Sequence, residues 1–386
     1  MPKVAKVAAV AVTKRLSLLL LACLAIFSQA AVLDDDRVDI LYQTYNGGGI
    51  EVEAPAIVAR KKLAENFALS GNYLVDMVSG ASIDAEVGAS PYEEERTEYG
   101  VGIEYLKDKS TLNLHYTNSS ENDYEADTLS LSVTQDFFGD LSTVNMGLSL
   151  GDDVIGNSTD PGFEENAKHY SMDFGWTQII SKNFITNIAF NKTVDEGFLR
   201  NPYRFIRIRE PDDPTSWFAS SENYPQTRSS DAWSVRGRYF IASRKVVYAS
   251  YRAFQDTWGI TASNYELGYT FAYRENWTLD FRYRAYEQTD ADFYRDLFDY
   301  VGQTTFYGRD KELSQMSDQM FSFSVGYDFA LADNQTFKKT SVYLFLDHIR
   351  FDYDNFRDAR VDTDAGEEPL YAFSANLIRI MFSIWF

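Results

Sequence analysis

Cysteine and histidine are the scarcest functional side chains in this chain of 386 residues. Cys23 is the only cysteine, so no internal disulfide and no thiolate-ligated metal or haem site can form. The three histidines, His115, His169 and His348, lack the spacing of a metal-binding pair. The phosphate-loop motif is also missing. We therefore expect no metal site, no cofactor and no enzymatic activity.

Long apolar runs are missing too. No stretch of 18 apolar residues occurs, so the sequence predicts no transmembrane helix. The apolar run from Leu16 to Phe27 is too short to cross roughly 30 Å of hydrocarbon. Basic residues precede it and small residues follow it, which predicts a secretory signal peptide over residues 1–30, cleaved after Ala30. The alternative is lipidation of Cys23, but Leu21 fits a lipoprotein box poorly.

Basic residues are few relative to acidic ones. The chain has 36 Lys and Arg against 57 Asp and Glu, a formal net charge of -21. Residues 1–30 contain four basic residues and no acidic one, so the mature chain carries -25. This acidity argues against nucleic acid as a partner. It suits transit through a periplasm, and loops that meet lipopolysaccharide through divalent cations.

Aromatic residues, in contrast, are plentiful. They make up 16% of the chain, with 26 Tyr and 28 Phe, although the mean hydropathy is only -0.32. A membrane barrel has aromatic girdles around a polar interior, which reconciles the two values. An aromatic-rich soluble sandwich is the alternative, and the end of the chain decides between them.

The last residues form an alternating strand that ends on an aromatic ring. The positions that share its apolar face are Ile378, Ile380, Phe382, Ile384 and Phe386. A soluble protein would leave such a strand as a sticky edge, whereas a closed barrel has no edge. The segment resembles the C-terminal signature of bacterial outer-membrane barrels, which the barrel-insertion machinery reads. We expect Phe382, Ile384 and Phe386 to form this assembly signal.

Alternation of apolar and polar residues recurs along the whole mature chain, residues 31–386. It predicts an all-β fold, a transmembrane antiparallel up-and-down β-barrel of about 16 strands. Fourteen strands is the alternative, because Gly47 to Gly49 could bend an inward-folded segment. The predicted strands are 37–45, 50–61, 66–79, 95–106, 111–118, 124–137, 141–150, 168–180, 184–194, 230–242, 246–256, 260–273, 277–289, 317–331, 337–350 and 370–386.

The predicted connections alternate between short turns and longer loops, as in bacterial barrels with periplasmic turns and outer loops. The segment 195–229 is too long for a simple connector. It is basic and partly apolar in an acidic chain. We expect it to fold inward as a constriction, with Arg204, Arg207 and Arg209 facing carboxylates of the barrel wall.

Several charged residues alternate with apolar ones inside predicted strands. A charge that faces lipid at mid-depth costs about 2–4 kcal/mol, so these side chains must point into the lumen. The candidate pore-lining residues are Arg236, Arg238, Arg252, Glu266, Asp280, Arg282, Arg284, Asp328 and Arg379, with Asp76, Glu104, Glu51 and Glu53 also assigned to the interior. They either plug the lumen as salt bridges or line an aqueous path, and we favour the path.

Five segments resemble a domain-of-unknown-function family of Gram-negative outer-membrane barrels. They are Tyr45 to Gly49, Val78 to Ser82, Ala89 to Arg96, Ser119 to Tyr124 and Gly197 to Arg204. One asparagine of the family's Leu-Asn-Asn-Pro-Tyr motif is Arg200 here. The resemblance implies a Gram-negative outer-membrane location and a small periplasmic or lipoprotein partner, in some members near redox or flavin-transfer functions.

The leading hypothesis is a channel for small polar solutes, embedded in outer-membrane lipid and lipopolysaccharide. The second is a closed barrel that scaffolds a periplasmic or lipoprotein partner. A membrane-embedded hydrolase ranks third, and it would use His115 or His348, which could both face the lumen. For these histidines a simple polar lining is the better interpretation.

Overall fold

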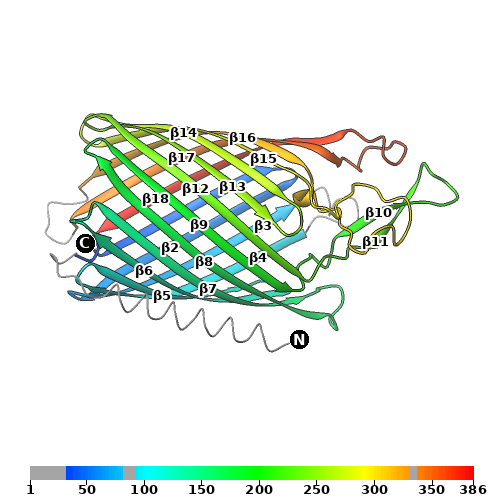
Figure 1. The fold of residues 1–386 in the computed structure, drawn as a ribbon, viewed down its shortest axis with the longest axis horizontal. Helices are drawn as coiled ribbons and strands as arrows, with labels where there is room; N and C mark the ends of the chain where they lie inside the picture. Colours follow the sequence, from blue (N-terminus) through cyan, green and yellow to red (C-terminus); the bar gives the residue numbers. More distant parts are fainter. Residues whose placement is uncertain (1–31, 81–91, 331–336) are drawn as a thin grey trace.

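The computed structural model describes residues 32–80, 92–330 and 337–386. Sixteen antiparallel strands follow one another around a closed barrel, as Figure 1 shows. The predicted transmembrane barrel of 16 strands is therefore confirmed, and the alternative of 14 strands is wrong. The predicted signal peptide, its cleavage after Ala30 and most of the loop 80–94 lie outside the described residues.

The first nine strands follow one another as hairpins. Their bounds are β1 Arg37–Gly47, β2 Ile50–Ala64, β3 Phe67–Gly80, β4 Tyr92–Lys107, β5 Ser110–Ser120, β6 Tyr124–Phe137, β7 Ser142–Gly156, β8 Glu164–Ser181 and β9 Phe184–Gly197. Gly48 and Gly49 join β1 to β2 with φ values of 62° and 84°, a conformation that glycine adopts freely. The glycines therefore form a tight hairpin turn between two barrel strands.

After β9 the chain leaves the wall and returns to it at β12. The remaining wall strands are β12 Thr227–Ala242, β13 Lys245–Asp256, β14 Thr261–Tyr273, β15 Trp277–Gln288, β16 Met316–Phe329, β17 Lys339–Arg357 and β18 Leu370–Trp385. Between β9 and β12 lies a separate hairpin of β10 Phe205–Arg209 and β11 Trp217–Ser221. A short 3-10 helix, η1 Lys311–Leu313, lies between β15 and β16.

The first and last strands close the barrel. β1 pairs with β18 in continuous register from Arg37 opposite Trp385 to Gly47 opposite Ala375. This pairing leaves neither strand as a free edge, which explains how a strand as apolar as β18 can end the chain. The outward positions Ile378 and Ile380 are 42% and 49% exposed, as expected for side chains that face lipid.

The two ends of the barrel differ. At one end, tight connections join the strands at 65–66, 108–109, 138–141, 182–183, 243–244 and 274–276. At the other end lie the long connections 198–226, 289–315 and 358–369, and the β10–β11 hairpin extends beyond the wall there (Figure 1). The predicted alternation of short and long connections is thus confirmed, although 121–123 and 257–260 are short at the long-loop end.

The outer face of the wall is apolar. Phe321 on β16 is 59% exposed, and Leu267 on β14 is 57% exposed. Phe281 and Tyr283 on β15 pair with Phe323 and Phe321 on β16, so that their rings form an outward aromatic band. Such a surface belongs in a bilayer. No helix of the described residues is long and apolar enough to span a membrane.

Candidate functional site

Strand register decides which charges face the interior. Trp233 and Val235 on β12 are exposed on the outer face, so the alternate residues Arg236 and Arg238 point inward. The same phase holds on the neighbouring strands. We call the inward-facing charged side chains of β12 to β18 the arginine wall. They include Arg236, Arg238, Arg252, Glu266, Asp280, Arg282, Arg284, Asp318, Asp328, Asp347 and Arg379.

The residues of this list that were predicted to face the interior all do so. The prediction is wrong for Glu51 and Glu53 on β2, because their register places them on the outward side with Met77, which is 41% exposed. Asp318 and Asp347 are interior carboxylates that sequence reasoning missed. Asp347 follows the lipid-facing Leu346, so the alternation of side chains along the strand could have predicted its inward position.

Ion pairs tie up one part of the arginine wall. Arg379 binds Asp347 at 2.6 Å, and Arg282 lies 3.7 Å from the same carboxylate. Arg284 binds Asp318 at 2.6 Å. Arg282 also lies 3.8 Å from Glu266, whereas Asp280 accepts hydrogen bonds from Tyr248 and Thr270. This part of the wall is a connected, rigid network.

Another part of the arginine wall is open. Arg238 and Arg252 have no hydrogen-bond or ion-pair partner among the described residues, and both are exposed although they face the interior. The Arg236 guanidinium lies 3.0 Å from the Glu266 carboxylate, which it shares with Arg282, and the Arg236 side chain is 43% exposed. An unpaired guanidinium inside a membrane barrel requires water around it. Both guanidinium groups are therefore accessible to water beside β12 and β13.

Small polar side chains line the opposite part of the barrel. We call the inward-facing residues of β5 to β9 the hydroxyl wall. One row across these strands consists of His115, Ser130, Ser149, Ser171 and Thr193. The Ser130 and Ser149 hydroxyls lie 2.8 Å apart, and Asn191 donates to Ser171 at 3.0 Å. These short side chains leave a recess of about 420 Å³ along β6, β7 and β8.

The histidines fall in three different environments. His115 faces the lumen as expected. His348 does not, because it pairs with the outward Phe321 and binds the Asn376 amide oxygen at 2.9 Å on the outer face. His169, to which we assigned no role, lies between Asp195 at 2.7 Å and Asp153 at 2.9 Å. Tyr124 donates to Asp153, so a polar network crosses the hydroxyl wall near the long loops.

The arginines of segment 195–229 pair with neighbouring outer loops, and the expected pairing with wall carboxylates is wrong. Arg207 on β10 is fully buried and binds Asp296 and Glu368. Arg204 binds Asp310. Arg209 lies 3.7 Å from Asp299. All these carboxylates belong to the connections 289–315 and 358–369. The three long loops therefore pack against one another through these ion pairs. We call this assembly of 198–226, 289–315 and 358–369 the cap.

Charge pairing holds the cap together. Burial alone would raise the pKa of the Glu368 carboxyl, but the hydrogen bond and charge of Arg207 lower it below its ordinary value. Backbone N–H groups, including that of Gly366 at 2.9 Å, add to the lowering. Ile206, Ile208 and Phe298 form a buried apolar cluster, with the two isoleucines on the face of β10 opposite Arg207. Glu368 therefore stays ionised and paired near neutral pH.

The cap rests on aromatic rings at the rim of β16 to β18. Phe293 and Tyr294 of the 289–315 connection share a buried cluster with Tyr353 on β17 and Tyr371 on β18. Tyr353 and Tyr371 take the inward phase of their strands. The cap thus covers the arginine-wall side of the mouth. Sequence reasoning found the long loops but could not show which of them contact one another.

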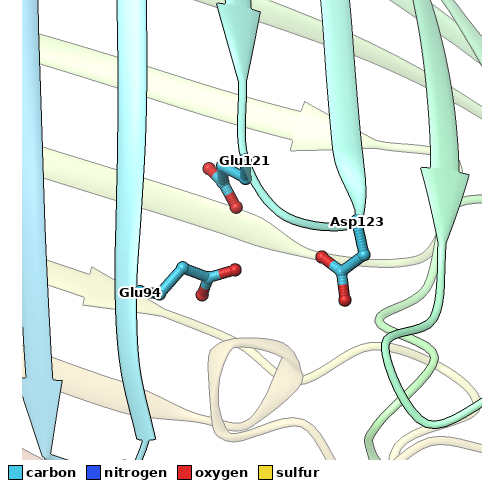
Figure 2. A group of neighbouring side chains, drawn as sticks. All are labelled: Glu94, Glu121 and Asp123. Carbon is cyan, nitrogen blue, oxygen red and sulfur yellow. The ribbon is translucent and has the colours of Figure 1, made fainter.

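Three carboxylates gather near the mouth on the other side. Glu94 on β4 and Glu121 and Asp123 of the 121–123 connection point toward one another in Figure 2, with oxygens within 4.8 Å. Burial raises the pKa of the Glu121 carboxyl, and the nearby charge of Glu94 adds to the rise. Oxygen ligands of this kind suit a hard divalent cation. Sequence reasoning missed the group because its members come from different hairpins.

Comparison with known proteins identifies a family. A family model described as "Protein of unknown function (DUF3570)" matches residues 85–343. No curated protein matches the chain. A bacterial polysaccharide outer membrane secretin is 9% identical over 92% of this chain and 100% of its own, with a TM-score of 0.49. A Pseudomonas aeruginosa FadL homologue is 9% identical over 91% of this chain and 89% of its own, with a TM-score of 0.41. OmpT of Vibrio cholerae is 9% identical over 93% of this chain and 100% of its own, with a TM-score of 0.44. At these identities and scores the likeness to solved structures carries no functional information.

Proposed function

Because the chain belongs to the DUF3570 family of unknown function, we propose a function from its geometry: it is an outer-membrane channel for small polar solutes. One observation carries this proposal. Arg236, Arg238 and Arg252 face the interior and yet are exposed, which requires water in the lumen at the depth of the wall strands. A lumen filled by salt bridges would bury these guanidinium groups.

Single-channel recording in a planar bilayer tests the proposal. The purified, heat-modifiable barrel is expected to give discrete conductance steps in KCl. The same protein, heated until its folded band is lost on a gel, serves as the control and should give no steps. A folded barrel that inserts into the bilayer and stays silent would refute the channel.

The cap favours a second candidate, a closed barrel that scaffolds a periplasmic or lipoprotein partner. Buried ion pairs around Arg207 lock three loops over one side of the mouth. If these loops seal the mouth, the barrel has a structural role. Deletion of 200–212 separates the two functions, since a sealed barrel would begin to conduct only after the deletion. A membrane-embedded hydrolase remains third, because His348, one of its two candidate histidines, lies on the outer face.

The proposal includes a location and an assembly route. We propose a Gram-negative outer membrane, reached with a cleaved signal peptide, and contact with its lipid and lipopolysaccharide. The apolar face of β18 supports recognition by the barrel-insertion machinery. Phe386 is the last residue, its backbone N–H donates to Asp36, and Lys61 lies 5.0 Å from its ring centre. Phe386→Ser should reduce the amount of heat-modifiable protein in the membrane fraction, whereas unchanged amounts would refute the signal.

A further inference from the structure

We infer that Arg252, Arg236 and Arg238, together with the hydroxyl wall, form a binding track for small organic anions that carry hydroxyl groups, such as sugar acids. This inference rests on the proposed channel function and names the class of solute. Four features of the described residues carry it: the spacing of the three arginines, their spare charge, the polar side chains beside them, and the room in front of those side chains.

The three arginines form a staircase along the barrel axis. Arg252 pairs with Ser234, Arg236 with Ser250, and Arg238 with Tyr248 in the register of β12 and β13. Each step is two residues, about 7 Å along a strand. An anion that leaves one guanidinium can therefore reach the next without crossing an uncharged gap. Stepwise transfer between weak sites is how a selective channel passes a solute that it also binds.

The staircase carries positive charge that no carboxylate of the wall neutralises. Two carboxylates of the arginine wall are engaged by arginines: Asp347 by Arg379 and Arg282, and Asp318 by Arg284. Asp328 lies 3.1 Å from Lys339, and Asp280 accepts hydrogen bonds from the Tyr248 and Thr270 hydroxyls. Glu266 serves Arg236. Arg238 and Arg252 have no such partner in the described part of the chain. Guanidinium groups bind carboxylate and phosphate oxygens through parallel N–H donors, so the natural occupant is an anion.

Hydroxyl and amide groups continue the same rows onto the next strands. Arg236 lies in register with Asn187 on β9, which pairs with Thr177 on β8. The Asn187 amide donates to the Thr177 hydroxyl at 3.0 Å. Such groups both donate and accept hydrogen bonds, which suits the hydroxyls of a polyol chain. An anion held by an arginine would therefore place its remaining hydroxyl groups on β8 and β9.

The hydroxyl wall also has room for a solute. The recess of about 420 Å³ lies within the range of small-molecule sites, and its inward lining includes Asn145, Ser149 and Asp173. A Cβ added at Gly147 would meet only ordinary contacts, the nearest at 3.5 Å from the Asp173 Cβ. Asp173 is exposed in this recess and would repel an anionic group. The solute is therefore oriented, with its charge toward β12 and its hydroxyls toward β7.

Current block by matched solutes tests the inference. The probes are glucuronate, which has charge and hydroxyls, glucose, which has only hydroxyls, and acetate, which has charge alone. We expect glucuronate to block at a concentration at least about tenfold below that of either control. R238Q/R252Q should weaken the block by at least about tenfold, because it removes the spare guanidinium groups. R350Q is the matched control, since Arg350 lies on β17 in the outward phase.

The outcomes separate this inference from the proposed function. Equal block by all three solutes, or a glucuronate block unchanged in folded R238Q/R252Q, would overturn the binding track while the channel stands. If the folded wild type shows no conductance at all, the channel fails. Calorimetric titration of glucuronate into the purified barrel then decides the track alone: saturable binding lost in R238Q/R252Q supports it, and no binding overturns it.

Discussion

The arginine wall of β12 to β18 and the hydroxyl wall of β5 to β9 belong to one antiparallel barrel. Their inward-facing side chains nevertheless differ in kind. On the arginine wall, long side chains such as Arg282 and Arg379 share carboxylates. On the hydroxyl wall, residues such as Ser130 and Ser149 pair at short range and leave a recess. Side-chain length thus separates a wall of ion pairs from a wall of short hydrogen-bonding groups.

Two glycines show the contrast on a small scale. Gly268 on β14 faces inward against the ring of Tyr248, whose hydroxyl donates to Asp280 at 3.1 Å. Gly147 on β7 faces inward too, but a Cβ there would meet only ordinary contacts, the nearest 3.5 Å from the Asp173 Cβ. A neighbouring ring therefore requires glycine at position 268, whereas position 147 has room for a methyl group.

Arg207→Met should have the largest effect on the structure, because it breaks the buried ion pairs that hold the cap on the arginine-wall side. The change leaves the buried Glu368 carboxylate without its cation, whereas Asp296 keeps Arg309 at 3.0 Å. Breaking a buried ion pair in this way costs about 3–5 kcal/mol, so the cap should detach from the rim. Limited proteolysis of the 210–216 hairpin tip should become much faster. Arg200→Met is the control, since Arg200 contacts the Phe198 ring at 5.0 Å and should leave cleavage unchanged. Equal protection of both variants would show that the ion pairs do not hold the cap.

Gly268→Ala and Gly147→Ala compare the two walls directly. A methyl group at Gly268 overlaps the Tyr248 ring, so we expect a loss of about 1–3 kcal/mol of unfolding free energy. The same methyl group at Gly147 meets only ordinary contacts, the nearest at 3.5 Å, and should change the stability by less than about 0.5 kcal/mol. Urea unfolding of the barrel in lipid, followed by tryptophan fluorescence, measures both. Equal effects at the two sites would remove the distinction between the walls.

Acid should loosen the cap through Glu368. Its pKa is lowered in the folded protein, so its pairing stabilises the cap fully above the ordinary value of 4.5. This stabilisation is lost as the pH falls through the lower folded value. Trp217 lies 5.5 Å from the Arg207 guanidinium, so its fluorescence should change below pH 4.5. In Glu368→Gln this transition should be absent, and an identical acid transition in that variant would exclude Glu368 as its cause.

The smallest expected effect is a pair of opposite shifts in ion preference. Arg238→Gln removes a positive charge from one wall, and Asp173→Asn removes a negative charge from the other. Reversal potentials in a KCl gradient should therefore move toward potassium for the first variant and toward chloride for the second. A shift of the same sign in both would mean that the two walls do not face a common aqueous path.

Much of the barrel could be predicted from sequence because its rules are local. Alternation along β16 placed Phe321 outside, and the inward phase of Arg282 and Arg379 followed from the cost of charge in lipid. The partners of Arg207 could not be predicted, because Asp296 and Glu368 come from loops that meet only in three dimensions. Register across several strands likewise hid the hydroxyl wall, whose members are ordinary serines and threonines on separate hairpins.

Single-channel recording of the folded wild-type barrel and of R238Q/R252Q in a KCl gradient tests the central claim most directly, namely that an aqueous path runs between the two walls. The account predicts discrete steps for both proteins and a reversal potential shifted toward potassium in the variant, because two unpaired guanidinium groups have left the path. Silence of the folded wild type, or identical reversal potentials in the two proteins, would contradict it.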